Sequence, residues 1–219
     1  MIDRRARKDI AARFDNPLLR VYIAGKLASD PLYEAATAIV REKPLPVLDI
    51  GCGIGLLGHF LHAAGTGCRY TGVDHDLRKI EAGRIALRRA QLDRSMDLIH
   101  ADAAAIAPTK GHVALLDVLH YLPAARQSEL LATAASHLAP GGSLILRNVV
   151  REANWRFRVT VAEEIWLKVS GLIRGGAQYF PDADDIRRPL EAAGLTVAMR
   201  RLHGRTPFNS YLIVAQRAM

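Results

Sequence analysis

The hydrophobic pattern of this chain changes character near residue 45. Before that point, apolar residues recur at helical spacing in three segments, 4–14, 18–28 and 30–41, separated by proline-containing breaks. After it, short apolar runs alternate with amphipathic helical segments. The pattern predicts a helical N-terminal cap over residues 1–42, positioned to cover a substrate cleft, followed by a second domain over residues 43–219.

The second domain reads as alternating strands and helices. Apolar runs indicate seven strands, at 47–50, 69–73, 97–100, 113–118, 143–149, 195–202 and 210–216. Helices are expected at 56–64, 77–91, 123–138 and 182–193. The link 204–209 is too short for a crossover helix, so the last two strands should be antiparallel. The expected fold is α/β: a seven-stranded, mostly parallel sheet with an antiparallel last strand and helices on both faces.

Residues 151–180 interrupt this alternation. Apolar residues recur there at helical spacing, with basic residues between them, and they include Trp155 and Trp166. The pattern predicts a helical insertion over the sheet or the cleft. It also fits a lid or an interfacial helix that meets a lipid-like substrate or a membrane surface. Because dimer helices carry the same apolar pattern, the sequence leaves the oligomeric state open.

Composition limits the class of protein. Of the 219 residues, 50% are hydrophobic and 24% are charged, which is typical of a soluble globular protein. No run approaches the ~18 apolar residues of a membrane span, and no signal-peptide core follows the basic N-terminus, so a cytoplasmic location is expected. Two cysteines form no disulfide framework and no metal-ligand cluster, so no metal is expected. The net charge of +8 would suit an acidic partner, an anionic membrane surface or nucleic acid.

A glycine-rich loop follows the first strand. It reads Asp49-Ile50-Gly51-Cys52-Gly53-Ile54-Gly55 and leads into a helix. Glycine lets the backbone adopt positive φ and lets a ligand approach where a Cβ would collide. The loop predicts a small-molecule site at the carboxyl end of the strand. The acid before it would repel a pyrophosphate but attract an ammonium group. Cys52 is interpreted as a small side chain that fits the loop rather than as a nucleophile.

Acidic residues also end the later strands. Asp74 ends the second strand, Asp102 follows the third and Asp117 follows the fourth. A carboxylate at the end of the second strand can accept hydrogen bonds from both hydroxyls of a ribose. Together with the loop, Asp74 therefore indicates a nucleoside ligand that also carries a cationic group.

These motifs resemble the class I S-adenosylmethionine-dependent methyltransferases over about residues 45–150. The loop at 49–55 matches the first motif of that family, Gly72-Val73-Asp74 the second, and Ala101-Asp102-Ala103 the third-strand position. Residues 117–122 resemble the fourth motif, and 138–142 resemble the turn before the fifth strand. The resemblance implies a Rossmann-like sheet, methyl transfer, and S-adenosyl-L-methionine as cofactor.

The resemblance also implies residue roles. The loop would approach the methionine part of the cofactor, Asp49 would lie near its amino group, Asp74 would clamp the ribose, and Asp102 with Ala103 would hold the adenine. His120 is the candidate general base if the acceptor must lose a proton, because imidazole titrates near neutrality. Tyr179, Asn209 and Tyr211 are further candidates. The expected site comprises catalytic His120 and Tyr121, and cofactor-binding Asp49, Gly51, Cys52, Gly53, Gly55, Leu56, Asp74, His75, Asp102, Ala103, Asp117 and Val118.

The acceptor is predicted to be small or carrier-bound. Residues 117–120 lack the Asn/Asp-Pro-Pro-aromatic motif of amino-methylating nucleic-acid enzymes, and neither cysteine has the Pro-Cys setting of cytosine-ring methylases. Residues 15–22 and 205–211 resemble methyltransferases of bacterial aryl-polyene or xanthomonadin-type pigment synthesis. That resemblance implies secondary metabolism and an aromatic polyene acyl chain on an acidic carrier protein. A nucleic-acid methyltransferase and a catalytically silent cofactor-binding scaffold are the alternatives, and O-, N- or C-methylation stays open.

Overall fold

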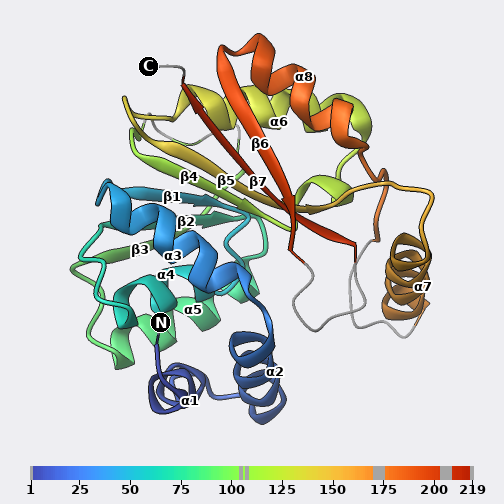
Figure 1. Ribbon diagram of the computed structural model, residues 1–219. Helices are drawn as coiled ribbons and strands as arrows, with labels where there is room; N and C mark the ends of the chain where they lie inside the picture. Colours follow the sequence, from blue (N-terminus) through green and yellow to red (C-terminus); the bar gives the residue numbers. More distant parts are fainter. Residues whose placement is uncertain (1, 104–105, 107–108, 170–175, 203–208, 218–219) are drawn as a thin grey trace.

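The structure is a computed structural model that describes residues 2–103, 106, 109–169, 176–202 and 209–217. Seven strands form one sheet in the order β3-β2-β1-β4-β5-β7-β6 (Figure 1). The strands are β1 Val47–Ile50, β2 Tyr70–Asp74, β3 Met96–His100, β4 His112–Leu116, β5 Ser143–Val149, β6 Leu195–Arg201 and β7 Ser210–Arg217. The helices are α1 Arg4–Ala12, α2 Pro17–Ser29, α3 Leu32–Glu42, α4 Leu56–Ala63, α5 Leu77–Arg89, the 3₁₀ helix η2 Leu119–Tyr121, α6 Ala124–Ser136, α7 Trp155–Val169 and α8 Ala183–Ala192.

The strand directions confirm the predicted fold. β1 runs parallel to both β2 and β4, whereas β7 is antiparallel to both β5 and β6. The chain first builds outward from β1 to β3 and then returns to place β4 on the other side of β1. The carboxyl ends of β1 and β4 therefore border the point where the strand order reverses, which is where open α/β sheets bind ligands.

Helices cover both faces of the sheet. One buried core joins α1 to α5 with the sheet and includes Phe14, Leu32 and Phe60. The other core lies under α6 and α8 and includes Leu131 and Ile186. Figure 1 shows α3, α4 and α5 on one side and α6 and α8 on the other. Among the described residues, no helix is long and apolar enough to cross a membrane.

The N-terminal helices begin and end for local reasons. The Asn16 side chain accepts the backbone N–H groups of Leu18 and Leu19, and Pro17 occupies the first turn, so α2 starts at the predicted break. The first helix ends at Ala12, two residues before the predicted Phe14, which instead packs edge-on against His59 with ring centroids 5.6 Å apart.

His59 is a buried contact between α1 and α4. The Arg13 guanidinium donates to His59 Nδ1 at 2.9 Å, and the side chain of His59 is fully buried. Burial, with the charge of Arg13, lowers the pKa of His59 to about 3, so the ring is neutral. This contact joins the end of α1 to α4, which packs on the sheet.

Candidate functional site

Two glycines of the loop 51–55 are required by the backbone conformation and by the lack of space for a Cβ atom. Gly51 and Gly55 have φ values of 77° and 74°, in the left-handed region that side chains disfavour. A Cβ on Gly51 would lie 2.4 Å from Val118, and one on Gly55 would lie 2.8 Å from Leu98. Val118 thus brings the segment after β4 directly against the loop after β1.

Asp74 ties the loop to the end of β2. Its carboxylate is buried, accepting the Gly53 N–H at 2.8 Å on Oδ2 and the Asp76 N–H at 2.8 Å on Oδ1. His75 is exposed, and its Nδ1 lies 3.6 Å from Asp74 Oδ1. Each carboxylate oxygen can accept more than one hydrogen bond, so Asp74 retains acceptor capacity for hydroxyl groups of a ligand.

Asp49 is a buried carboxyl group on the face of β1 that turns toward α4. Tyr70 donates its hydroxyl to Asp49 Oδ2 at 2.5 Å. Within the described part of the chain, Asp49 Oδ1 is buried without a hydrogen-bond partner. Burial raises the pKa of Asp49 to about 7, and the charge of Asp74 adds to this effect.

Cys52 and Leu56 serve the packing of the loop. Burial raises the pKa of the Cys52 thiol far above its usual range, and the charges of Asp49 and Asp74 raise it further, so the thiolate is suppressed. The Cys52 sulfur also fills the space beside Gly72, where a Cβ would lie 2.7 Å from it. Leu56 is buried at the start of α4.

Asp102 and Ala103 follow β3 beside the end of β2. The Ala101 N–H donates to the backbone carbonyl oxygen of Asp74 at 3.2 Å, which joins this segment to the end of β2. Asp102 is exposed and Ala103 is half-buried. Residues 104–105 and 107–108 lie outside the described residues.

The side chain of Asp117 lies in an ion-pair network. Asp117 adopts φ 58° after β4, and Arg147 of β5 donates to both of its carboxylate oxygens, at 2.8 Å from Nε to Oδ1. Arg147 also donates to Asp30, the residue that ends α2, and Lys26 lies 3.8 Å from Asp30 and 4.0 Å from Asp117. Burial alone would raise the pKa of Asp117, but the charges of Arg147 and Lys26 outweigh it and the pKa lies below its usual value.

His120 lies in η2, immediately after this segment. Its side chain is 2% exposed, and its Nδ1 lies 2.9 Å from Oδ1 of Asn148 on β5. The ring stacks on Phe180 with centroids 5.8 Å apart and 7° between the planes, and the half-buried Tyr121 ring is 4.2 Å away. The predicted catalytic pair therefore sits together among aromatic rings beside the carboxyl ends of β4 and β5.

The segment 178–180 is fastened over η2. The Gln178 N–H donates to the His120 carbonyl oxygen at 2.8 Å. The buried Gln127 side chain of α6 lies within hydrogen-bond distance of the carbonyl oxygens of Leu119, Leu122 and Tyr179, at 2.8–2.9 Å. These contacts hold Phe180 against the His120 ring.

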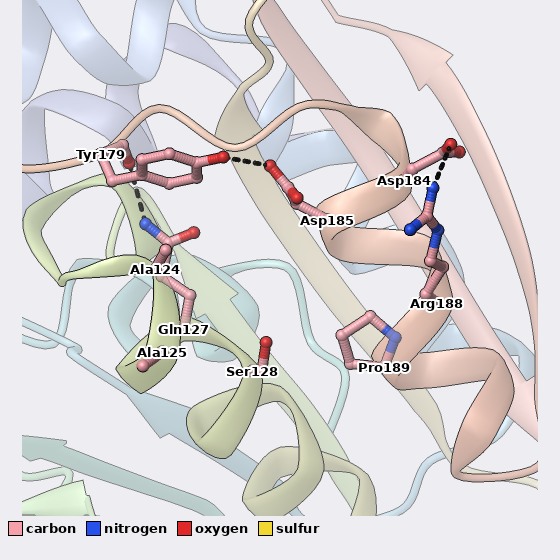
Figure 2. A pocket seen from close by; sticks show the side chains of 9 residues that line it. All are labelled: Ala124, Ala125, Gln127, Ser128, Tyr179, Asp184, Asp185, Arg188 and Pro189. Atoms are coloured by element: carbon pink, nitrogen blue, oxygen red, sulfur yellow. Dashed lines mark hydrogen bonds and ion pairs between the residues drawn. The ribbon is translucent and has the colours of Figure 1, made fainter.

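A surface groove lies between α6 and α8, on the other side of Gln127 and Tyr179 from η2. It encloses about 350 Å³, and Figure 2 shows the nine side chains that line it. Its polar groups bond to one another: the Tyr179 hydroxyl donates to Asp185 at 2.8 Å, and Arg188 donates to Asp184 at 3.1 Å. None of the residues predicted to bind the cofactor lines this groove.

Asn209 and Tyr211 anchor the start of α7. Asn209 is fully buried, its Nδ2 donates to the Val150 carbonyl oxygen at 2.7 Å, and its N–H donates to Thr160 Oγ1 at 3.0 Å. The Tyr211 hydroxyl donates to Glu152 Oε1 at 2.5 Å. Residues 205–208, which precede them in the closing motif, lie outside the described residues, as do 170–175 of the insertion and the side chains of 163–169, Trp166 among them.

The sequence prediction missed Arg147 and Asn148. Both lie in β5, where every residue is buried and the others except Ser143 are apolar. Two adjacent polar residues inside such a strand are a signal, because buried polar groups require partners that must come from elsewhere in the fold. Here those partners are Asp117, Asp30 and His120.

The site fits the cofactor that the sequence implies. The carboxylates of Asp49 and Asp74 both lie close to Cys52 of the glycine loop. Asp49 Oδ1 is a buried acceptor without a partner among the described residues, and a cationic ligand beside it would offset the cost of burying it. Asp74 offers carboxylate oxygens at the end of β2, the position for ribose hydroxyls. S-adenosylmethionine carries an ammonium group, a sulfonium and a ribose, so the donor set and the charge match.

Comparison with known proteins identifies related sequences. The model of a family described as "Methyltransferase domain" matches residues 21–199. The chain is 27% identical over 218 residues to a trans-aconitate 2-methyltransferase of Paracidovorax citrulli, covering 86% of this chain and 79% of that protein. It is 30% identical over 138 residues to a ribosomal protein L11 methyltransferase of Chromohalobacter salexigens, covering 57% of this chain and only 44% of that protein.

The fold also matches solved structures. A magnesium protoporphyrin IX methyltransferase from Synechocystis PCC 6803 with bound SAH superimposes with a TM-score of 0.68 and 23% sequence identity. The match covers 93% of this chain and 88% of that one. The pyocyanin biosynthetic protein PhzM matches with a TM-score of 0.66 and 19% identity over 97% of this chain and 62% of that one. At these identities, the matches establish a shared fold.

Proposed function

From the premise that this chain belongs to the methyltransferase-domain family and is an S-adenosylmethionine-dependent methyltransferase, we propose that its acceptor is a small or carrier-bound, aromatic or lipid-like molecule. The observation that carries the proposal is the placement of a buried histidine among aromatic rings at the edge of the sheet that holds the glycine loop. An acceptor that binds there would meet the aromatic side chains of Tyr121 and Phe180 beside His120.

The cofactor site follows from the residues already placed. We assign Asp74 to the ribose, the loop 51–55 to the methionine part, Asp49 to the neighbourhood of the amino group, and Asp102 with Ala103 to the adenine. When bound, S-adenosylmethionine supplies a methyl group already activated by its sulfonium. The protein then contributes mainly position and orientation, which can account for up to ~7–11 kcal/mol of barrier reduction.

His120 is the proposed general base for an acceptor that must lose a proton. It is buried and held on several sides, so a proton acceptor would be presented in a fixed orientation. Tyr121 is proposed to line the acceptor pocket beside it, since its ring is half-buried and adjoins that of His120. Neither Cys52 nor Cys68 is assigned a chemical role.

Exposed apolar side chains support an apolar acceptor. On α2, Leu18, Val21 and Tyr22 are 81%, 74% and 57% exposed, and on α7 Trp155 is 60% exposed. Lys26, which lies over the Tyr22 ring at 5.8 Å, reaches Asp117, so this face of α2 lies near the carboxyl end of β4. Figure 1 shows α2 and α7 projecting beyond the sheet. Large apolar side chains in such positions mark binding surfaces when they cluster.

Relatives support a small acceptor without naming it. The proteins compared above are named for trans-aconitate and magnesium protoporphyrin IX, which are small molecules, and for ribosomal protein L11, which is a protein. The trans-aconitate relative matches most of its length, whereas the L11 relative matches less than half. The longer match favours a small-molecule acceptor for this chain.

The positive charge supports an acidic carrier as the partner that delivers the acceptor. The net charge is +8, and Arg4, Arg5 and Lys8 of α1 are exposed. Opposite charge steers association and makes it sensitive to salt. An aryl-polyene type of acyl chain on an acyl carrier protein would combine this charge with an apolar aromatic acceptor. An anionic lipid surface is the other partner that the same features would suit.

A turnover assay with matched acceptors tests the proposal. S-adenosylhomocysteine formation is measured with a hydroxylated aromatic or polyene acid presented free, as a pantetheine thioester, and as a thioester on an acidic acyl carrier protein. We expect turnover on these acids, faster from the carrier than from pantetheine, with the difference lost at high salt. Turnover confined to RNA or DNA would contradict the proposal. Cofactor binding with no turnover on any class would favour the silent scaffold.

A further inference from the structure

Asn148 and His120 form a buried pair whose hydrogen-bond direction is fixed. Asn148 is fully buried, and its Nδ2 donates to the Val149 carbonyl oxygen at 2.8 Å. Turning the amide over would place its oxygen against that carbonyl, so that two acceptors would face each other away from water. The Asn148 oxygen therefore points to His120 Nδ1, 2.9 Å away.

This direction decides the tautomer of the ring. An amide oxygen only accepts, so the proton of the neutral imidazole must sit on Nδ1, and Nε2 carries the lone pair. When Nε2 takes a proton, Nδ1–H still donates to Asn148, so the same contact serves the neutral and the cationic ring. The stacked Phe180 and the adjacent Tyr121 restrict rotation of the ring into another arrangement.

We propose that Asn148 is a positioning residue that holds His120 as the Nδ1–H tautomer and so directs its Nε2 lone pair to the proton of the acceptor. The proton moves from the acceptor to Nε2, which leaves an imidazolium and a deprotonated acceptor to receive the methyl group. The tautomer assignment stands on the geometry alone. The use of Nε2 rests on the base role proposed above.

Imidazole NMR tests the tautomer without an acceptor. The ¹⁵N-labelled protein with S-adenosylhomocysteine is examined by long-range ¹H–¹⁵N correlation at about pH 8, and His120 is assigned by its loss in His120→Gln. We expect an Nδ1–H pattern for His120. His112 provides an internal reference of the opposite kind, because the Ser143 N–H donates to its Nδ1 at 3.1 Å and its Nε2 lies 2.7 Å from the Lys43 carbonyl oxygen. An Nε2–H pattern for His120 would overturn the inference.

Variants separate positioning from general packing. Asn148→Leu removes the acceptor and should abolish the Nδ1–H pattern, whereas Phe180→Leu, which loosens the same cage, should preserve it. Asn148→Asp retains the shape and adds a negative charge, so the titration midpoint of His120 should rise by about one to two pH units. An unchanged midpoint in Asn148→Asp would refute the contact even if Asn148→Leu fails to fold.

Separate results would contradict the tautomer of His120 and the use of its Nε2 as the base. Undiminished turnover of His120→Gln on an acceptor found by the assay above would overturn the use of Nε2, whatever the tautomer. An Nε2–H ring in a protein that needs His120 for turnover would overturn the role of Asn148 and leave the proposed methyl transfer intact.

Discussion

Asp49 is the residue whose environment differs most from that of an ordinary acid. The hydroxyl of Tyr70 donates a hydrogen bond to one carboxylate oxygen of Asp49. Burial and the charge of Asp74 raise the pKa of Asp49 from 3.8 to about 7. A raised pKa means that the folded protein binds this proton more tightly than the unfolded chain does. The stabilisation from that proton is complete below about pH 3.8 and is lost as the pH rises through about 7.

Cofactor binding should therefore depend on pH through Asp49. A ligand ammonium group near the carboxylate favours its ionised form, so binding below about pH 7 should release a proton. The affinity for S-adenosylhomocysteine should rise with pH, by up to about tenfold per unit, and level off above about pH 7. Titration calorimetry in buffers of different ionisation enthalpy measures the released proton.

Asp49→Asn supplies the control for this linkage. The variant can still accept the Tyr70 hydroxyl but cannot ionise, so its affinity should lose the pH dependence. If the wild-type protein shows the same affinity and no proton release between about pH 5.5 and 7, Asp49 does not face the cationic part of the cofactor.

At the scale of elements, Arg147 joins the N-terminal helices to the site. It lies in β5, and its 8% exposed side chain bridges Asp117 after β4 and Asp30 at the end of α2. Asp117 in turn precedes Val118, which packs against Gly51. One buried guanidinium thus fixes α2, the segment after β4 and the glycine loop relative to each other.

Removing this guanidinium should cost more than removing the neighbouring amine. Arg147→Met leaves the carboxylates of Asp30 and Asp117 with one cation, Lys26 at 3.8–4.0 Å, and without the guanidinium hydrogen bonds, so it should lower the free energy of unfolding by about 3–5 kcal/mol. Lys26→Met, the matched loss of a more exposed cation from the same network, should cost less than about 1 kcal/mol. Urea unfolding measures both, and limited proteolysis should cut Arg147→Met first within residues 1–42. If both variants lose less than about 1 kcal/mol of unfolding free energy, the ion pairs of Arg147 do not hold residues 1–42 in place.

The elements were largely predictable because their boundaries have local causes. The side chains of Asn16 and Asp182 cap α2 and α8 through backbone N–H groups two or three residues away, so each helix start depends on neighbouring residues. The predicted strands 47–50 and 143–149 match the structure. The 3₁₀ helix η2 was not predicted, since three residues carry no periodic signal and it depends on Gln127 and the segment 178–180.

The side-chain contacts between distant parts of the chain could not be predicted from the sequence. The loop 49–55 and Asp74 could be located because their motifs are local and their strands are adjacent. Asn148 lies 28 residues from His120, and Asp30, which follows α2, lies 117 residues from Arg147, and no spacing rule links either pair. The hydrogen bonds of the candidates Asn209 and Tyr211 to Val150 and Glu152, near the start of α7, also join residues 59 positions apart and have no spacing rule.

For the whole molecule, one edge of the sheet holds the residues proposed to bind the cofactor and the acceptor. Asp49 and Asp74 lie in the last residues of β1 and β2, and the glycine loop, the Asp117 segment and His120 follow the carboxyl ends of β1 and β4. Figure 1 shows α2 and α7 projecting beyond the sheet. Both hydrophobic cores lie behind this edge, on the two faces of the sheet. We propose that this edge binds the cofactor through Asp74.

Calorimetric titration with S-adenosylhomocysteine tests that claim most directly. Three proteins are compared: wild type, Asp74→Asn, and Asp93→Asn, which changes an exposed acid in the turn after α5 in the same way. We predict that Asp93→Asn binds like wild type and that Asp74→Asn binds about 10- to 100-fold more weakly, as expected for losing hydrogen bonds to a charged group. Equal affinity of Asp74→Asn and wild type would contradict the assignment of the ribose to Asp74.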